Sequence, residues 1–317
     1  MIDTAALARA ITWAASKQSY LTARLLADRD LSDDCLRAYA YFRWADDVVD
    51  HPSQPLTARN AFIARQKMLV DSFYHGNPPM DLCPEEQILA DLITHDRGPE
   101  SGLNSFIHNF MKVIEFDADR RGRLTTRAEL TAYMSWLATA VMDGIQYFIG
   151  NGHPYPKTAD RSTAVMGAHL AHMLRDTLED LQVGIINIPV EDMPFEKNPL
   201  ELVESSQFCL WVKDQVQRAR LFLQAGHRYI DTLDVLRCKI AGAWYCARFE
   251  WFLDTIQREG YLLRQAYPER NSLPAWVRMV GLGLSITLKH FTGRFLHGFS
   301  RHDPQVLAGT EGNEYLR

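Results

Sequence analysis

The sequence predicts an all-α protein with one helical domain. Long segments place apolar residues at a helical period, alternating strand patterns are almost absent, and Gly- and Pro-rich breaks lie far apart. The 317 residues are enough to bury one large core, and no change of composition marks a linker. We therefore predict one domain over residues 1–299 and a polar C-terminal tail over residues 300–317.

The breaks divide the chain into ten expected helices. Ala and Leu dominate the first, Ser32 is the expected N-cap of the second, and prolines after residue 51 end it. Thr126 and Glu129 have the spacing of a capping box at the start of the sixth helix. A loop with three prolines is expected over residues 184–199. The helices are expected at residues 2–27, 32–50, 57–74, 84–95, 103–121, 126–149, 158–183, 201–230, 235–260 and 273–295.

Composition excludes several classes of protein. A net charge of -5 and a pI near 6.1 argue against a general nucleic-acid binder. The five cysteines form no C-x-x-C pair, so neither a zinc site nor a disulfide framework is expected. No signal peptide or membrane-spanning run is apparent. These features predict a cytoplasmic protein, and peripheral membrane contact through residues 273–295 stays open.

One expected helix combines acidic and aromatic residues. Asp46, Asp47 and Asp50 stand near Arg43, among Tyr, Phe, Trp and Val side chains. Asp46 and Asp50 are one helical turn apart, so their carboxylates share a face and repel each other. A hard divalent cation such as Mg2+, which prefers carboxylate oxygens, turns that repulsion into attraction. A single motif of this kind is also typical of a solvated acidic face.

A second motif repeats the pattern far along the chain. Arg175 precedes Asp176, and Asp180 follows one turn later. Two such helices predict acidic walls that face each other across a central cavity, with several metal ions between them. This arrangement suits a diphosphate, because metal ions neutralise its charge and promote its departure. The aromatic and Met side chains would line the cavity, although core packing explains any one of them equally well.

These residues resemble the squalene/phytoene synthases, prenyltransferases that join two prenyl diphosphates head to head. Residues 41–50 are similar to that family's first aspartate-rich motif. Residues 174–180, followed by Gly184 and Pro189, are similar to its second. Residues 20–26 and 115–117 agree more weakly. The resemblance implies an isoprenoid-synthase-type helical bundle in which two Asp-rich helices flank a central cavity.

The resemblance also implies roles for individual residues. Tyr133 would be catalytic, with its ring face beside a carbocation. Two or three Mg2+ ions would be held by four catalytic aspartates, namely Asp46, Asp50, Asp176 and Asp180. Prenyl diphosphate would be contacted by Arg43, Arg175, Tyr39, His169 and His172. NADPH, which a reductive squalene synthase needs, is left open, because members that use it lack a G-x-G-x-x-G motif.

Several departures from the family pattern keep alternatives open. His169 and His172 stand where the family has Gln and Asn, and Ile185 stands where it has an Arg that follows the glycine. The leading hypothesis is Mg2+-dependent head-to-head coupling of two prenyl diphosphates to a squalene- or phytoene-type product. The alternative is a single-diphosphate enzyme that alkylates an aromatic acceptor, with His169, His172 or Asp143 taking the proton. A non-catalytic assembly factor on this fold is a third hypothesis, which the intact aspartates disfavour.

Overall fold

The computed structural model describes most of the chain. The described residues are 2–51, 53–77, 79–98, 100–193, 203, 205–267 and 273–299. The expected tail at residues 300–317 lies outside them, as does part of the expected loop at residues 184–199.

The described residues form an all-α fold, which confirms the predicted class. They contain eleven α-helices, two short 3-10 helices and no strand. The 3-10 helices are η1 (Ala159–Ser162) and η2 (Val190–Asp192). The α-helices are α1 (Thr4–Ala15), α2 (Lys17–Leu26), α3 (Ser32–Asp50), α4 (Leu56–Tyr74), α5 (Pro84–Thr94), α6 (Gly102–Arg120), α7 (Arg127–Ile149), α8 (Thr163–Gln182), α10 (Ser206–Asp231), α11 (Leu236–Arg258) and α12 (Leu273–Phe299).

The prediction of one continuous helix over residues 2–27 is wrong. Ser16 has extended backbone angles (φ -156°, ψ 100°), and its N–H donates to the carbonyl of Thr12, which ends α1. Its side chain accepts a hydrogen bond from the N–H of Ser19 and so caps α2. A serine that competes with the helical backbone in this way favours a cap over a helix interior, and neither Gly nor Pro marks the position.

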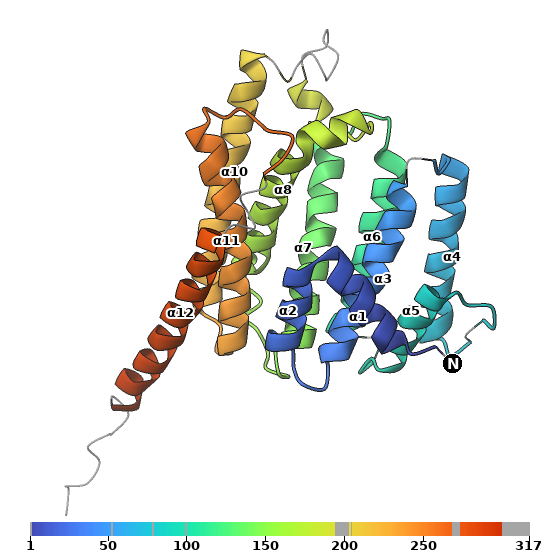
Figure 1. Ribbon diagram of the computed structural model, residues 1–317, viewed down its shortest axis with the longest axis horizontal. Helices are drawn as coiled ribbons and strands as arrows, with labels where there is room; N and C mark the ends of the chain where they lie inside the picture. Colours follow the sequence, from blue (N-terminus) through green and yellow to red (C-terminus); the bar gives the residue numbers. More distant parts are fainter. Residues whose placement is uncertain are drawn as a thin grey trace, which may run out of the picture.

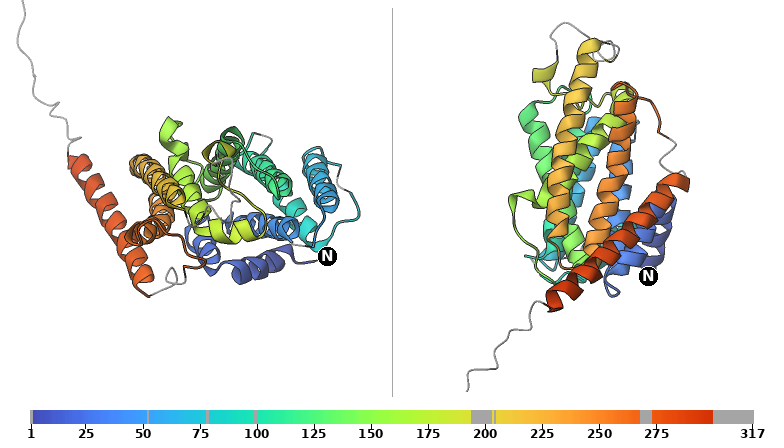
Figure 2. Two further views of the ribbon diagram at one scale, coloured as in Figure 1. Left: turned by 90° about the horizontal axis from the view of Figure 1, so that it is seen from above. Right: turned by 90° about the vertical axis from the view of Figure 1, so that its left-hand side faces the viewer.

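The helices pack as one bundle in which α7 and α8 are central (Figure 1). On one side α3 packs on α1, α5 and α6, and on the other α8 packs on α10 and α11. Small residues bring α8 and α10 close together. A Cβ at Gly226 would lie 2.6 Å from Ala164, and one at Gly167 would lie 2.8 Å from the carbonyl oxygen of Ala219. The two views in Figure 2 show α8, α10 and α11 side by side, with α12 on the outside of α11.

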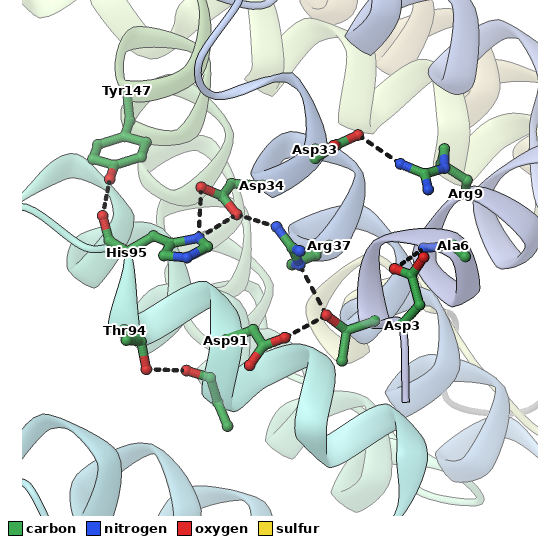
Figure 3. Close-up of polar contacts among 12 residues, drawn as sticks. Asp3, Ala6, Arg9, Asp33, Asp34, Arg37, Asp91, Thr94, His95 and Tyr147 are labelled. Carbon is green, nitrogen blue, oxygen red and sulfur yellow. Dashed lines mark hydrogen bonds and ion pairs between the residues drawn. The ribbon is translucent and has the colours of Figure 1, made fainter. Parts of the chain in front are cut away.

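Polar contacts fix the N-terminal half of α3 (Figure 3). Asp34 is 5% exposed and accepts a 2.6 Å hydrogen bond from Arg37. His95, which follows α5, lies 2.9 Å from the same carboxylate. Arg9 of α1 donates to Asp33 at 3.1 Å. These contacts hold α3 against α1 and α5, and thereby position its opposite end, which carries the first acidic motif.

The C-terminal helix agrees with the prediction at its start and is longer at its end. It begins at Leu273 and continues to Phe299, four residues beyond the expected end. None of the helices that the structure describes combines the length and hydropathy that a transmembrane segment requires.

Candidate active site

The first acidic motif occupies the C-terminal half of α3. Nη1 of Arg43 lies 3.5 Å from Oδ2 of Asp46, and the same guanidinium forms a second ion pair with Asp47. Burial, together with the charge of Asp50, raises the pKa of Asp46 to about 7, compared with an ordinary 3.8. Burial also raises the pKa of Asp50. Negative charge is therefore unfavourable at this pair unless a cation is near.

Arg43 and Tyr39 are neighbours on α3, one turn apart. The hydrogen bond to Asp47 raises the pKa of Arg43, and Tyr39 adds to that effect. Arg43 is half-exposed, with a side-chain accessibility of 42%. Carboxylates therefore hold the guanidinium group of Arg43 at the surface end of the motif, where an incoming anion can reach it.

The second acidic motif lies on α8. Arg175 binds Asp176 with two hydrogen bonds, Nε to Oδ1 at 2.5 Å and Nη2 to Oδ2 at 2.6 Å. Nε2 of His172 lies 3.4 Å from Asp176. Burial and the charge of Asp176 raise the pKa of Asp180 to about 7. In each motif, burial and a neighbouring carboxylate therefore raise the pKa of one aspartate.

The C-terminal turn of α6 joins the two motifs. Nη2 of Arg120 lies 2.7 Å from Asp117, and Nη1 donates to Oδ1 of Asn187 at 2.5 Å. Nδ2 of Asn187 in turn donates to Oδ2 of Asp180 at 2.6 Å. The charge of Asp117 contributes to the raised pKa of both Asp46 and Asp180. Coulomb coupling of this kind falls off with distance, so Asp117 lies near one carboxylate of each motif.

Tyr133 is buried beside this linking pair. Its hydroxyl donates to Oδ2 of Asp117 at 3.1 Å. The guanidinium of Arg120 lies 5.0 Å from its ring centroid, within cation–π range. The rings of Phe116 and His169 both lie 5.2 Å from it. Contacts with both the hydroxyl and the ring therefore hold the Tyr133 side chain in place.

The two histidines have different surroundings. His169 is 8% exposed, and burial lowers its pKa to about 3, so its imidazole is neutral near pH 7. His172 is exposed and contacts Arg175 and the ring of Phe249. The structure therefore places His169 with Tyr133, and His172 with the second acidic motif.

Asp143 does not join this group. Arg161 donates to its Oδ1 at 2.5 Å and Ser105 to its Oδ2 at 2.5 Å. Both oxygens are engaged between α6, α7 and η1, which favours a role in holding these elements together over proton transfer.

Sequence reasoning missed Arg120 and Asn187, and it named Asp117 only within a weak likeness. The separation of Asp117 and Arg120 by three residues on an expected helix is the one available signal, because residues at that spacing are neighbours on a helix. Asn187 lies in the segment after α8, where no periodicity indicates which way a side chain points.

The donor set fits Mg2+. Each of the two motif helices carries two carboxylates, and burial together with a neighbouring charge raises the pKa of Asp46 and of Asp180 to about 7. Within the described part of the chain, no three His, Cys, Asp or Glu side chains are close enough to ligate one ion alone. Mg2+ commonly uses one or two carboxylates completed by water and substrate phosphate oxygens, and each motif carries two.

The all-α bundle carries an acidic motif on each of two helices, and comparisons with known proteins identify its class as the prenyltransferases. The family model described as squalene/phytoene synthase matches residues 13–277. The chain belongs to the squalene/phytoene synthase family, whose members are prenyltransferases that generally depend on divalent metal. The comparison with curated proteins gave no match.

Solved structures with the same fold share little sequence with this chain. Squalene synthase HpnC from Alicyclobacillus acidocaldarius is 18% identical, with a TM-score of 0.63 over 82% of this chain and 95% of that one. A dehydrosqualene synthase in complex with ligand is 17% identical, with a TM-score of 0.67 over 91% and 97%. The TcSQS complex is 14% identical, with a TM-score of 0.68 over 96% and 94%. At these sequence identities, the structural similarity establishes a shared fold and nothing more specific.

Proposed function

We propose that this chain is a Mg2+-dependent prenyltransferase that ionises an allylic prenyl diphosphate and couples it head to head to a second prenyl diphosphate. The observation that supports the proposal is the position of Asp117 near both motifs: its charge contributes to the raised pKa of Asp46 and of Asp180, and its partner Arg120 is linked through Asn187 to Asp180. One acidic helix on each side of one site can hold a diphosphate through metal ions. A single acidic surface cannot do so from two sides.

The aspartates would hold the metal ions, and the arginines would orient the substrate. Asp46 and Asp50 would lie on one side of the site, and Asp176 and Asp180 on the other. Mg2+ bound by them would neutralise the diphosphate and favour its departure. Arg43 would exchange part of its contact with Asp47 for phosphate oxygens, because guanidinium binds phosphate with the same fork geometry as carboxylate.

Tyr133 and His169 would act at the hydrocarbon end of the substrate. Cleavage of the C1–O bond leaves an allylic cation and a free diphosphate, and the double bond of the second prenyl chain attacks that cation. Loss of a proton from that C1 then supplies the electron pair that closes a cyclopropane ring, which balances the charge. Tyr133 is held by Asp117 beside a neutral His169, so the imidazole adds no positive charge next to the cation.

One observation favours the alternative with a single diphosphate and an aromatic acceptor. Ile185 is 7% exposed, and its N–H donates to the carbonyl oxygen of Asp180 at 2.8 Å. An apolar side chain therefore occupies the position where the family has a cation beside the second motif. A site with one fewer cation suits one diphosphate better than two.

Product analysis tests both proposals. The protein is incubated with farnesyl or geranylgeranyl diphosphate and Mg2+, with and without NADPH, and products are identified by mass spectrometry. A C30 or C40 hydrocarbon or its cyclopropyl diphosphate precursor supports head-to-head coupling. Turnover only after addition of an aromatic acceptor supports the alternative, and no turnover under either condition contradicts both.

Variants separate the site from the fold. Asp46→Asn and Asp180→Asn should each abolish turnover, because each removes a metal-binding carboxylate. Asp33→Asn, on the same helix as Asp46 but at its other end, should retain it. Equal loss in all three variants would indicate a general folding defect.

A further inference from the structure

Three arginines lie at the end of α6 and just after it, and one of them, Arg121, has no carboxylate partner among the described residues. Arg120 forms an ion pair with Asp117 at 2.7 Å, and Arg123 forms ion pairs with two acidic neighbours at 2.7 Å and 2.9 Å. Nη2 of Arg121 donates instead to the backbone carbonyl oxygen of Asp50 at 3.0 Å. The positive charge of Arg121 is therefore not neutralised by a side chain in the part of the chain that the structure describes.

The contact with Asp50 places Arg121 beside the first acidic motif. Asp50 is the last residue of α3, and its carbonyl is one of the four at a helix end that lack a partner within the helix. Burial raises the pKa of the Asp50 carboxyl, and among the charges that oppose this rise Arg121 comes first, before Arg120 and Arg43. Because Coulomb interactions weaken with distance, the guanidinium of Arg121 lies near the carboxylate of Asp50 as well as its carbonyl oxygen.

The next residue connects Arg121 to the segment that follows the second acidic motif. The N–H of Gly122 donates to the carbonyl oxygen of Gly184 at 2.7 Å, and both glycines have a positive φ (79° and 80°) that other residues rarely adopt. Residues 184–190 contain no charged side chain. Arg121 therefore lies where a side-chain contact with the first motif meets a backbone contact with an uncharged segment after the second.

We propose that Arg121 binds the diphosphate of the prenyl substrate, with its unused N–H groups on phosphate oxygens. A guanidinium has five N–H donors, and the contact with Asp50 uses one of them. A charge-assisted bond to phosphate is stronger than a bond to a neutral carbonyl, and Arg121 needs to release no carboxylate to form it. Arg43, by contrast, has to give up part of its contact with Asp47. The inference rests on the proposed function, because it names a further residue that holds the same diphosphate.

Calorimetric titration with farnesyl thiodiphosphate and with inorganic pyrophosphate, each in the presence of Mg2+, tests the inference. Arg121→Gln removes the charge but keeps an N–H donor for the carbonyl of Asp50. We expect this variant to bind both ligands roughly 10- to 100-fold more weakly than the wild type, because a charged donor to phosphate is lost. Arg121→Lys keeps the charge without the fork geometry and should lose less affinity.

The matched control is Arg123→Gln. It makes the same chemical change two residues away, in an arginine that is already paired with carboxylates, and should leave both affinities unchanged. Urea unfolding checks that the variants are folded.

Titration with Mn2+ in the absence of diphosphate separates phosphate binding from a structural role. Arg121→Gln removes a cation near Asp50, so its Mn2+ affinity should be equal to or higher than that of the wild type, because like charges repel. A distorted motif would instead bind both Mn2+ and diphosphate more weakly.

The outcomes distinguish this inference from the proposed function. A wild type that binds neither phosphate ligand contradicts the proposed function, and the inference fails with it. If the wild type binds both ligands and Arg121→Gln binds them equally well, only the inference is overturned. It is also overturned if Arg123→Gln weakens binding as much as Arg121→Gln, or if Arg121→Gln loses Mn2+ affinity in parallel with diphosphate affinity.

Discussion

Asp180→Asn should stabilise the metal-free protein at about pH 8. The folded-state pKa of Asp180 is about 7, against an ordinary 3.8. Because the folded value is the higher one, the folded state binds more protons between about pH 4 and pH 7, and stability falls as pH rises through that window. The whole shift corresponds to about 4 kcal/mol at roughly 1.4 kcal/mol per pKa unit. Asp180 is partly exposed, so solvent screening reduces the expected gain to about 1–2 kcal/mol.

Urea unfolding at about pH 5 and pH 8, without metal, measures this effect. Asp180→Asn should have a larger free energy of unfolding than the wild type mainly at the higher pH. Glu179→Gln removes the charge of an exposed side chain on the same helix, so it should change the free energy of unfolding little at either pH. Mg2+ should then stabilise the wild type and not the variant, because it binds only the folded state. If Asp180→Asn is no more stable than the wild type at the higher pH, the electrostatic description of the site is wrong.

Three further changes test the surroundings of the site. Asn187→Ala should weaken Mn2+ or Mg2+ binding by roughly 10- to 100-fold in calorimetric titration, because it removes the hydrogen bond that orients Asp180, whereas Asn109→Ala on α6 should not. Arg120→Met should lower the free energy of unfolding by about 3–5 kcal/mol, and adding Asp117→Asn should recover part of that loss; no recovery would contradict the assigned pairing. Asp143→Asn should also lower the free energy of unfolding, because it breaks an ion pair, yet leave metal affinity unchanged. A selective loss of metal binding would show that Asp143 belongs to the metal site.

The sequence was sufficient for the fold class and for most helices. Gly- and Pro-rich breaks between long periodic segments placed nine of the ten expected helices close to their observed positions. The break at Ser16 was missed, because a serine cap inside an Ala-rich segment resembles helix interior until its backbone angles are known. The single-domain boundaries and the tail at residues 300–317 stay predictions.

The acidic motifs were predictable, and their connection was not. The spacing of Asp46 and Asp50, and of Asp176 and Asp180, follows directly from the helical repeat. Arg120 belongs to a third helix and Asn187 to the segment after α8, so only tertiary packing brings them together. The roles assigned to the aspartates, to Tyr133 and to His169 stay proposals, whereas the structure fixes where these side chains lie.

The central claim is that Asp46 and Asp180 serve one metal-dependent diphosphate site from opposite sides. Calorimetric binding of a non-hydrolysable farnesyl thiodiphosphate with Mg2+ tests it in the wild type, in Asp46→Asn, in Asp180→Asn and in the double variant. We expect each single substitution to weaken binding at least about tenfold, and the double variant to lose less than the sum of the two free energies, because residues that share a partner are not additive. Unchanged affinity in either single variant, or strictly additive losses, would contradict the account.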